Sequence, residues 1–121
     1  MSDRFFDNWT TQLRKGLLEM CMLNAMSTGP VYGYDIARQL RDIEGLVTSE
    51  GTVYPILSRF KRAGLVQARL EESAEGPARK YYELTESGRE VLDRMRAMWA
   101  LIVAGVQNMQ AEGRGRGGDR R

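Results

Sequence analysis

The sequence lacks histidine altogether and contains one cysteine, Cys21, among its 121 residues. Without imidazole there can be no Ser-His-Asp triad, no Cys-His nucleophile and no histidine metal ligand. One thiol excludes both an intramolecular disulfide and a cysteine-rich zinc site. Carboxylate chemistry is the catalytic class that remains, but the acidic residues form no recognisable pair. We therefore expect no enzyme, no metal and no cofactor.

Long hydrophobic runs are also missing. The apolar stretch Leu17–Met26 is too short to span a bilayer and is interrupted by Glu19 and Asn24. The first residues do not resemble a secretory signal. We therefore expect a cytoplasmic protein that makes no contact with membranes. A length of 121 residues suits one domain with an additional helix or tail.

Charge of one sign does not dominate the chain, whose net charge is +2, but basic residues cluster locally. The stretch Gly51–Leu70 contains arginine and lysine but no acid, Arg79 and Lys80 are adjacent, and four arginines lie within residues 114–121. Scattered over a surface, these residues would be ordinary solvated charges. Their arrangement in the fold therefore decides whether they form a patch for phosphate groups.

Apolar periodicity predicts three helices in the first half of the chain. The first, Trp9–Ser27, is apolar nearly all round in its second half, which predicts burial on more than one side. The second runs from Tyr32 to Asp42. The third begins near Ser49, a good N-cap, and its buried face has the spacing i, i+3, i+4, i+7. That face consists of Val53, Ile56, Leu57 and Phe60. Pro55 favours a late start or a distorted first turn of this helix.

The period then changes to that of strands. Residues alternate over Val66–Leu70 and again over Lys80–Leu84, which predicts a hairpin with the polar loop Glu72–Ala78 at its tip. Thr85 is predicted to cap a final helix that ends near Ala111. Residues 112–121, rich in glycine and arginine, are expected to form a flexible basic tail.

The final helix carries a heptad seam with steps of three and four residues. The seam consists of Leu92, Met95, Trp99, Ile102, Val106 and Met109. It lies on a helix about 39 Å long, and one small domain has no core that could cover such a stripe. The seam therefore predicts a homodimer; the alternative is that the helix packs only onto the first helix of its own chain.

The order helix, helix, helix, hairpin, helix predicts a mainly α fold with a small β-hairpin. It is typical of a winged helix-turn-helix, here over residues 9–84, followed by a dimerisation helix over residues 85–111. With its apolar face turned inward, the third helix presents small hydroxyls, one aromatic ring and two cations. Such a surface can enter a major groove of double-stranded DNA. The exposed set is Thr52, Tyr54, Pro55, Ser58, Arg59 and Arg62.

Three ordered segments resemble the PadR family of bacterial transcriptional regulators. They are GPVYGYDIARQL (residues 29–40), SEGTVYPILSRFKRAGLV (49–66) and EGPARKYYELTESGRE (75–90), and LRKGLLEMCML (13–23) fits the same pattern. The resemblance covers residues 13–92. It implies an N-terminal winged helix, a C-terminal helical dimerisation element and a repressor function. The single terminal helix is similar to the short subgroup that includes multidrug-responsive repressors. The Gly/Arg tail is not part of the family pattern.

The resemblance also implies that Tyr54 and the pair Arg79-Lys80 approach DNA phosphates. The full set of predicted DNA-contacting residues is Ser49, Thr52, Tyr54, Ser58, Arg59, Arg62, Arg79 and Lys80. Tyr54 has the alternative of stacking on the first helix. Arg59 and Arg62 could instead lie on a solvated face of the helix without contacting DNA. Arg79 and Lys80 could form salt bridges across the hairpin to Glu71, Glu72 or Glu75.

In the multidrug-binding relatives, a tryptophan at the matching place in the last helix stacks on planar ligands. The resemblance therefore implies that Trp99 binds a planar aromatic or cationic effector between the two chains; the alternative is that Trp99 only fills the dimer core. Thioethers adapt to varied shapes, and Trp9 could add a second wall. The other candidate effector residues are Met20, Met95, Met98 and Trp9.

These inferences combine into one functional hypothesis. A homodimer would bind a pseudo-palindromic operator, repress transcription and be released by a small-molecule effector. A winged-helix adaptor that contacts proteins and binds no DNA is the alternative. The polar outward face of Ser49–Ala63 argues against that adaptor.

Overall fold

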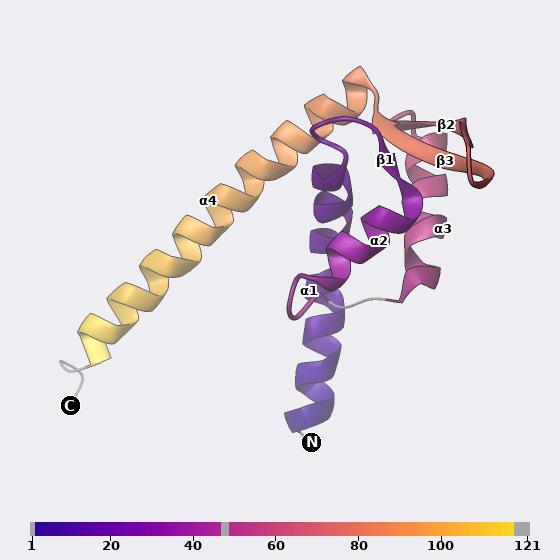
Figure 1. The fold of residues 1–121 in the computed structure, drawn as a ribbon. Coiled ribbons are helices and arrows are strands. Elements are labelled where there is room, and N and C mark those ends of the chain that lie inside the picture. The colour runs from indigo at the N-terminus through magenta and orange to yellow at the C-terminus, as the bar shows by residue number, and fades with distance from the viewer. Residues whose placement is uncertain (1, 47–48, 118–121) are drawn as a thin grey trace.

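The computed structural model describes residues 2–46 and 49–117, and it confirms a mainly helical fold with a small antiparallel sheet. Figure 1 shows α2, α3 and the sheet gathered beside one half of α1, while α4 leaves this body and diverges from α1. The elements are α1 (Ser2–Ala25), β1 (Val31–Tyr32), α2 (Gly33–Arg41), α3 (Glu50–Arg62), β2 (Val66–Ser73), β3 (Gly76–Leu84) and α4 (Glu86–Gly117).

The second half of α1 lies in the centre of the core, as its all-round apolar composition predicts. Met22 and Leu23 of this helix, and Met26 just after its end, have no exposed surface. The predicted start at Trp9 is wrong, because α1 already begins at Ser2. The extra turns were missed because they contribute nothing to the core. They project from the domain with their aromatic side chains exposed, and Asp3 in the first turn suits the helix dipole.

The sheet has three strands in the order β1-β3-β2 rather than the two predicted. The additional strand, β1, pairs antiparallel with β3 through Val31 opposite Tyr82 and Tyr32 opposite Tyr81. Two residues are too few to show a period, so this strand is defined only by its partner. It places Tyr32 at the start of α2, which begins one residue later than predicted.

The hairpin is longer than predicted, and the expected loop Glu72–Ala78 is wrong. β2 continues to Ser73 and β3 begins at Gly76, so only Ala74 and Glu75 lie between the strands. The outer part of the hairpin extends beyond the core, where neither face is buried and no alternation of apolar and polar residues is required. A register irregularity lies between Glu71 and Ser73.

The third helix, α3, buries the predicted face: Val53, Leu57 and Phe60 are buried and Ile56 is partly buried. The helix begins at Glu50 with Ser49 as its N-cap, as predicted. Ser49 has the extended backbone of an N-cap but makes no side-chain capping bond; its hydroxyl lies 3.2 Å from that of Thr52. The late start that Pro55 was expected to favour does not occur, because the first helical residue is Glu50. Pro55 removes the bond to the carbonyl of Gly51, which is exposed and can be hydrated.

Thr85 caps α4 as predicted and also ties it to the turn after α3. The backbone N–H of Gly88 donates to Thr85 Oγ1 at 3.0 Å, and the same hydroxyl donates to the carbonyl of Gly64 at 2.6 Å. The N–H of Thr85 donates to the carbonyl of Leu65 at 3.0 Å. These bonds fix the direction in which α4 leaves the domain.

The last helix joins the core only at its start. Leu92 is 2% exposed in the core of its own chain, and Val91 and Met95 pack against that core. The remaining part of α4 extends to Gly117, past the predicted end at Ala111, so residues 112–117 of the predicted tail are helical and residues 118–121 lie outside the described residues. Within the described chain, no helix combines the length and apolarity that a membrane crossing needs.

Gly88 allows the closest approach between α4 and the rest of the domain. A Cβ atom at this position would lie 2.0 Å from the carbonyl oxygen of Leu65. Because the clash is with backbone, Gly88→Ala is expected to lower the free energy of unfolding by about 2–3 kcal/mol. Urea denaturation followed by circular dichroism at fixed protein concentration measures the change.

Gly113→Ala is the matched control on the same helix, since a Cβ atom at Gly113 meets nothing within 4 Å. It is expected to leave stability unchanged within about 1 kcal/mol or to raise it slightly. Equal stability of the two variants would contradict the tight junction at Leu65.

Candidate nucleic-acid interface

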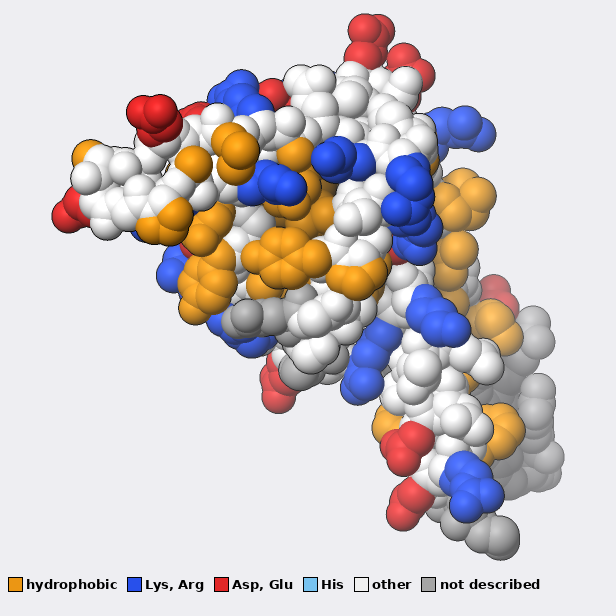
Figure 2. All heavy atoms as spheres, turned by 90° about the vertical axis from the view of Figure 1, so that its right-hand side faces the viewer, with side chains coloured by type: hydrophobic (Ala, Val, Ile, Leu, Met, Phe, Trp, Pro, Cys, Tyr) orange, Lys and Arg blue, Asp and Glu red, His pale blue; other side chains and the backbone are white. Residues whose placement is uncertain are grey.

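The outward face of α3 is a strip of small side chains. Gly51, Pro55 and Ser58 lie along its centre and Arg62 at its C-terminal end, and all four are exposed. Figure 2 shows the side of the molecule that carries α3 and the hairpin, with apolar and aromatic side chains in the middle, lysines and arginines around them, and acids at the rim. A strip without bulky side chains lets the helix backbone approach a flat or concave partner closely.

Tyr54 lies at the edge of this strip, 44% exposed. Its ring rests against the start of α2: a Cβ atom placed on Gly33 would lie 3.1 Å from Cε1 of Tyr54 and 3.2 Å from Cε1 of Tyr82. The support is thus α2 and β3, not the first helix considered in the sequence analysis. Burial raises the pKa of Tyr82 above its ordinary value, and the neighbouring Tyr54 raises it further.

The two predicted cations of α3 differ in their surroundings. Arg59 forms an ion pair with Glu19 of α1, and its guanidinium carbon lies 6.0 Å from the centre of the Phe60 ring. This contact directs Arg59 towards α1. Arg62, one turn later, is exposed at the C-terminal end of the strip.

Arg79 and Lys80 project from opposite faces of the hairpin, because successive residues of a strand alternate. Lys80 lies opposite Leu70, on the face whose inner residue Tyr82 packs in the core beside α3. The guanidinium carbon of Arg79 lies 5.1 Å from the centre of the Tyr32 ring on the other face. Only Lys80 therefore shares the side of α3.

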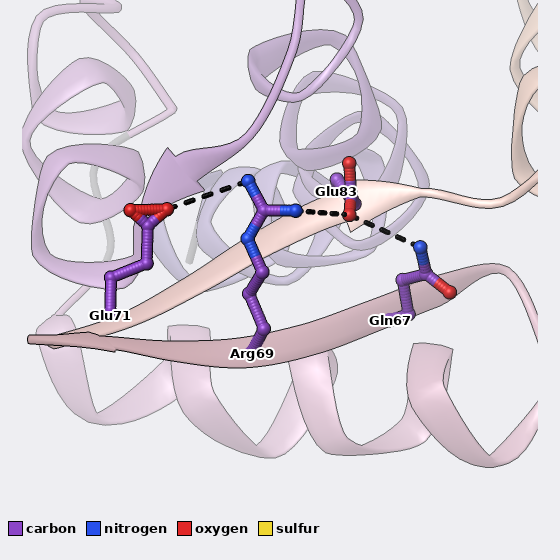
Figure 3. A network of polar contacts seen from close by, with 4 residues as sticks. All are labelled: Gln67, Arg69, Glu71 and Glu83. Carbon is purple, nitrogen blue, oxygen red and sulfur yellow. Dashed lines mark hydrogen bonds and ion pairs between the residues drawn. The ribbon is translucent and has the colours of Figure 1, made fainter.

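The salt bridges of Arg79 or Lys80 to Glu71, Glu72 or Glu75, considered as the alternative to DNA contact, do not occur among the described residues. The cation that forms salt bridges on the hairpin is Arg69, which pairs with Glu71 at 3.4 Å and with Glu83 at 3.3 Å. Gln67 also donates a hydrogen bond to Glu83 at 3.1 Å. Figure 3 shows Arg69 between these partners, linking β2 to β3. The network neutralises Arg69 and joins the two strands of the hairpin at its base.

An aromatic cluster near the start of α2 was missed by the sequence analysis. The ring centre of Tyr32 lies 5.8 Å from that of Tyr81 and 6.2 Å from that of Tyr34, and the guanidinium carbon of Arg41 lies 6.0 Å from the Tyr34 ring. The segment VYGY contains two of these tyrosines, but only the pairing of β1 with β3 brings Tyr81 to them.

A groove of about 700 Å³ lies between α1 and α4. Its walls include four of the five predicted effector residues, namely Met20, Met95, Met98 and Trp99. Trp9 does not line it and stacks instead on Phe6, with ring centres 6.0 Å apart. Gln12, Glu19 and Arg94 add polar groups to the lining. The two walls are held together by Arg96, whose Nε donates to Oδ1 of Asn24 at 2.8 Å.

Residues 2–46 and 49–117 contain no group of three acidic or cysteine side chains placed to hold a metal ion. The thiol of Cys21 is half-buried, and burial raises its pKa. The arrangement offers a binding surface and a groove.

Comparison with known proteins agrees with this description. A family model described as the transcriptional regulator PadR-like family matches residues 22–94. A PadR-like transcriptional regulator from Bacillus cereus is 36% identical with a TM-score of 0.75, over 82% of this chain and 96% of that one. A PadR family regulator from Eggerthella lenta is 29% identical with a TM-score of 0.75, over 90% and 95%.

A third solved structure, Bacillus subtilis PadR in complex with operator DNA, is 25% identical with a TM-score of 0.59. The match covers 64% of this chain and 44% of that one. The similarity to this DNA-bound protein therefore extends over part of each chain.

Proposed function

Because the chain belongs to the PadR-like family of transcriptional regulators, we propose that it binds operator DNA as a homodimer and represses transcription in the cytoplasm until a small molecule releases it. The DNA-binding part is supported above all by α3, whose exposed strip of small residues lies beside a hairpin with a lysine on the same side. The repressor part rests on the family resemblance.

In this proposal α3 enters the major groove, which is about 12 Å wide and admits a helix. Gly51, Pro55 and Ser58 permit close approach to the base edges, with Ser49 and Thr52 at the N-terminal end of the helix. Tyr54, Arg62 and Lys80 contact the phosphates on either side. The B. subtilis PadR structure in complex with operator DNA supports DNA binding by this chain. Selection of bound sequences from random DNA tests it and yields the operator; an adaptor that binds only protein would select no sequence.

The hairpin cations give a specific prediction. The double variant Arg79→Ala/Lys80→Ala is expected to weaken binding to all DNA sequences alike and to lower the slope of log affinity against log salt by at most about two. Lys80→Ala alone should account for most of the change, because Arg79 lies on the other face against Tyr32. Fluorescence anisotropy with labelled operator at several salt concentrations measures both quantities.

Lys15→Ala, which removes an exposed cation from α1, is the control and should leave the salt slope unchanged. An unaltered affinity of the double variant would refute a role of the hairpin in DNA binding. An effect of Arg79→Ala as large as that of Lys80→Ala would refute the distinction between the two faces.

The dimer is supported by apolar side chains on α4 that stay largely exposed within the described part of the chain. Leu92 is buried in the core of its own chain, so the seam available to a partner starts at Met95. It continues through Trp99, Ile102, Val106 and Met109, which are 41–74% exposed. Phe5, Phe6 and Trp9 of α1 are also exposed apolar side chains. In such a dimer the two α3 helices would lie about 34 Å apart, which is one turn of the DNA double helix, and would contact the two halves of a pseudo-palindrome.

Ile102→Glu is expected to convert the dimer to monomers, because it places a charge in the centre of the seam. Analytical ultracentrifugation at micromolar concentration measures the conversion. Ala104→Glu adds the same charge on the opposite side of the helix and should remain dimeric. Dissociation of both variants, or of neither, would contradict the proposed seam.

The effector site is proposed in the groove between α1 and α4, closed by the partner chain. Trp99 is 41% exposed there and offers a planar surface, and the thioethers of Met95 and Met98 adapt to varied ligands. The ligand class is planar aromatic or cationic. Its binding would change the spacing of the two α3 helices and release DNA, provided its affinity differs between the two spacings.

Single-tryptophan variants separate the two possible fluorescence signals. In Trp9→Phe, which retains Trp99, a panel of planar aromatic compounds is expected to include strong quenchers. In Trp99→Phe the same compounds should quench Trp9 weakly, because Trp9 lies outside the groove lining. No quenching of Trp99 across the panel would count against the site.

A further inference from the structure

Glu19 belongs to two sites at once. It is among the residues that line the groove between α1 and α4, and its carboxylate forms the ion pair with Arg59 of α3. Figure 1 shows how this is achieved, because α1 stands between α4 on one side and α3 on the other. Among the described residues that line the groove, Glu19 is the only acid. It therefore links the groove electrostatically to the helix proposed to read DNA.

Arg59 lies at the border of the exposed strip of α3. It follows Pro55 by one turn and precedes Arg62 by three residues, so it is a surface neighbour of both. Its side chain is 49% exposed, and that of Glu19 is 34% exposed. The pair thus leaves Arg59 close to the strip but with its charge compensated and its guanidinium directed towards α1.

We propose that Glu19 withholds Arg59 from DNA, so that loss of the Glu19 charge releases Arg59 to a phosphate and tightens binding. The inference rests on the proposed function, since it assigns a control residue to the same DNA-binding surface. By the same electrostatics, an organic cation bound against Glu19 in the groove would release Arg59, whereas a neutral ligand would leave the pair intact. Arg94, which also lines the groove, forms no ion pair with Glu19 among the described residues, so this carboxylate is left to Arg59.

Four proteins test the proposal: the wild type, Glu19→Gln, Arg59→Gln and the double variant. One additional phosphate contact makes the slope of log affinity against log salt concentration steeper by about 0.9. Glu19→Gln is therefore expected to bind the selected operator about eightfold more tightly at 0.1 M salt, with a salt slope steeper by about 0.9. Arg59→Gln alone should stay within about twofold of the wild type, and the double variant should return to wild-type affinity and slope.

Glu90→Gln is the matched control, because it removes an exposed carboxylate of α4 outside the groove lining. If Glu19→Gln and Glu90→Gln raised the affinity for DNA equally, the effect would come from net charge alone, which would overturn the proposal. So would a loss of affinity in Arg59→Gln alone, which would mean that Arg59 already contacts DNA. Unchanged affinity and slope of a folded Glu19→Gln would also overturn it.

Thermal unfolding shows whether each variant is folded, and Glu19→Ala replaces Glu19→Gln if the latter is not. Failure of the proposed function has a different signature: the wild type itself would select no DNA sequence, and none of the four proteins would bind in a salt-dependent way.

Discussion

The burial of the second half of α1 is the constraint on which the rest of the structure depends. Met22 and Leu23 of this helix, and Met26 just after its end, are fully buried, and each such side chain favours folding by about 1.5–3 kcal/mol when it leaves water. Helices α2 and α3, the sheet and the start of α4 must therefore all pack around this segment. Because α1 continues beyond the core at its N-terminus and α4 leaves the core after Met95, the two helices diverge and a groove forms between them.

Local signals in the sequence were sufficient for much of this fold. The spacing of Val53, Leu57 and Phe60 correctly identified the buried face of α3, and the hydroxyl of Thr85 correctly identified the start of α4. Both signals act within one or two turns of the chain. The strand β1 could not be found in this way, because a two-residue strand exists only through its pairing with β3, about 50 residues later.

In the candidate site, too, features set by the local sequence could be predicted and contacts set by tertiary packing could not. That Arg79 and Lys80 face opposite sides follows from the period of a strand and could have been predicted once the strand was recognised. That Arg79 stacks on Tyr32, that Arg69 holds both Glu71 and Glu83, and that Arg59 pairs with Glu19 could not be predicted, since each contact joins elements brought together by tertiary packing. The number of cations in the stretch from Gly51 to Leu70 therefore overstates the charge presented to a partner, because two of them are compensated within the chain.

The weakness of the Glu19–Arg59 pair is what suits it to control. Ion pairs between half-exposed side chains contribute about 0–1 kcal/mol to stability, and both partners here belong to that class. Breaking the pair therefore does not threaten the fold, which the apolar core maintains. A ligand can shift an equilibrium only by its differential affinity for the two states, and a difference of about 1 kcal/mol, roughly fivefold, is within reach of a single contact. Such control requires that the ion pair and the phosphate contact be of similar strength, so that Arg59 stays with Glu19 while that charge is present and moves to a phosphate, releasing a condensed counterion, once the charge is lost. Because the two contacts are closely balanced, a small change at Glu19 is enough to decide which of them Arg59 makes.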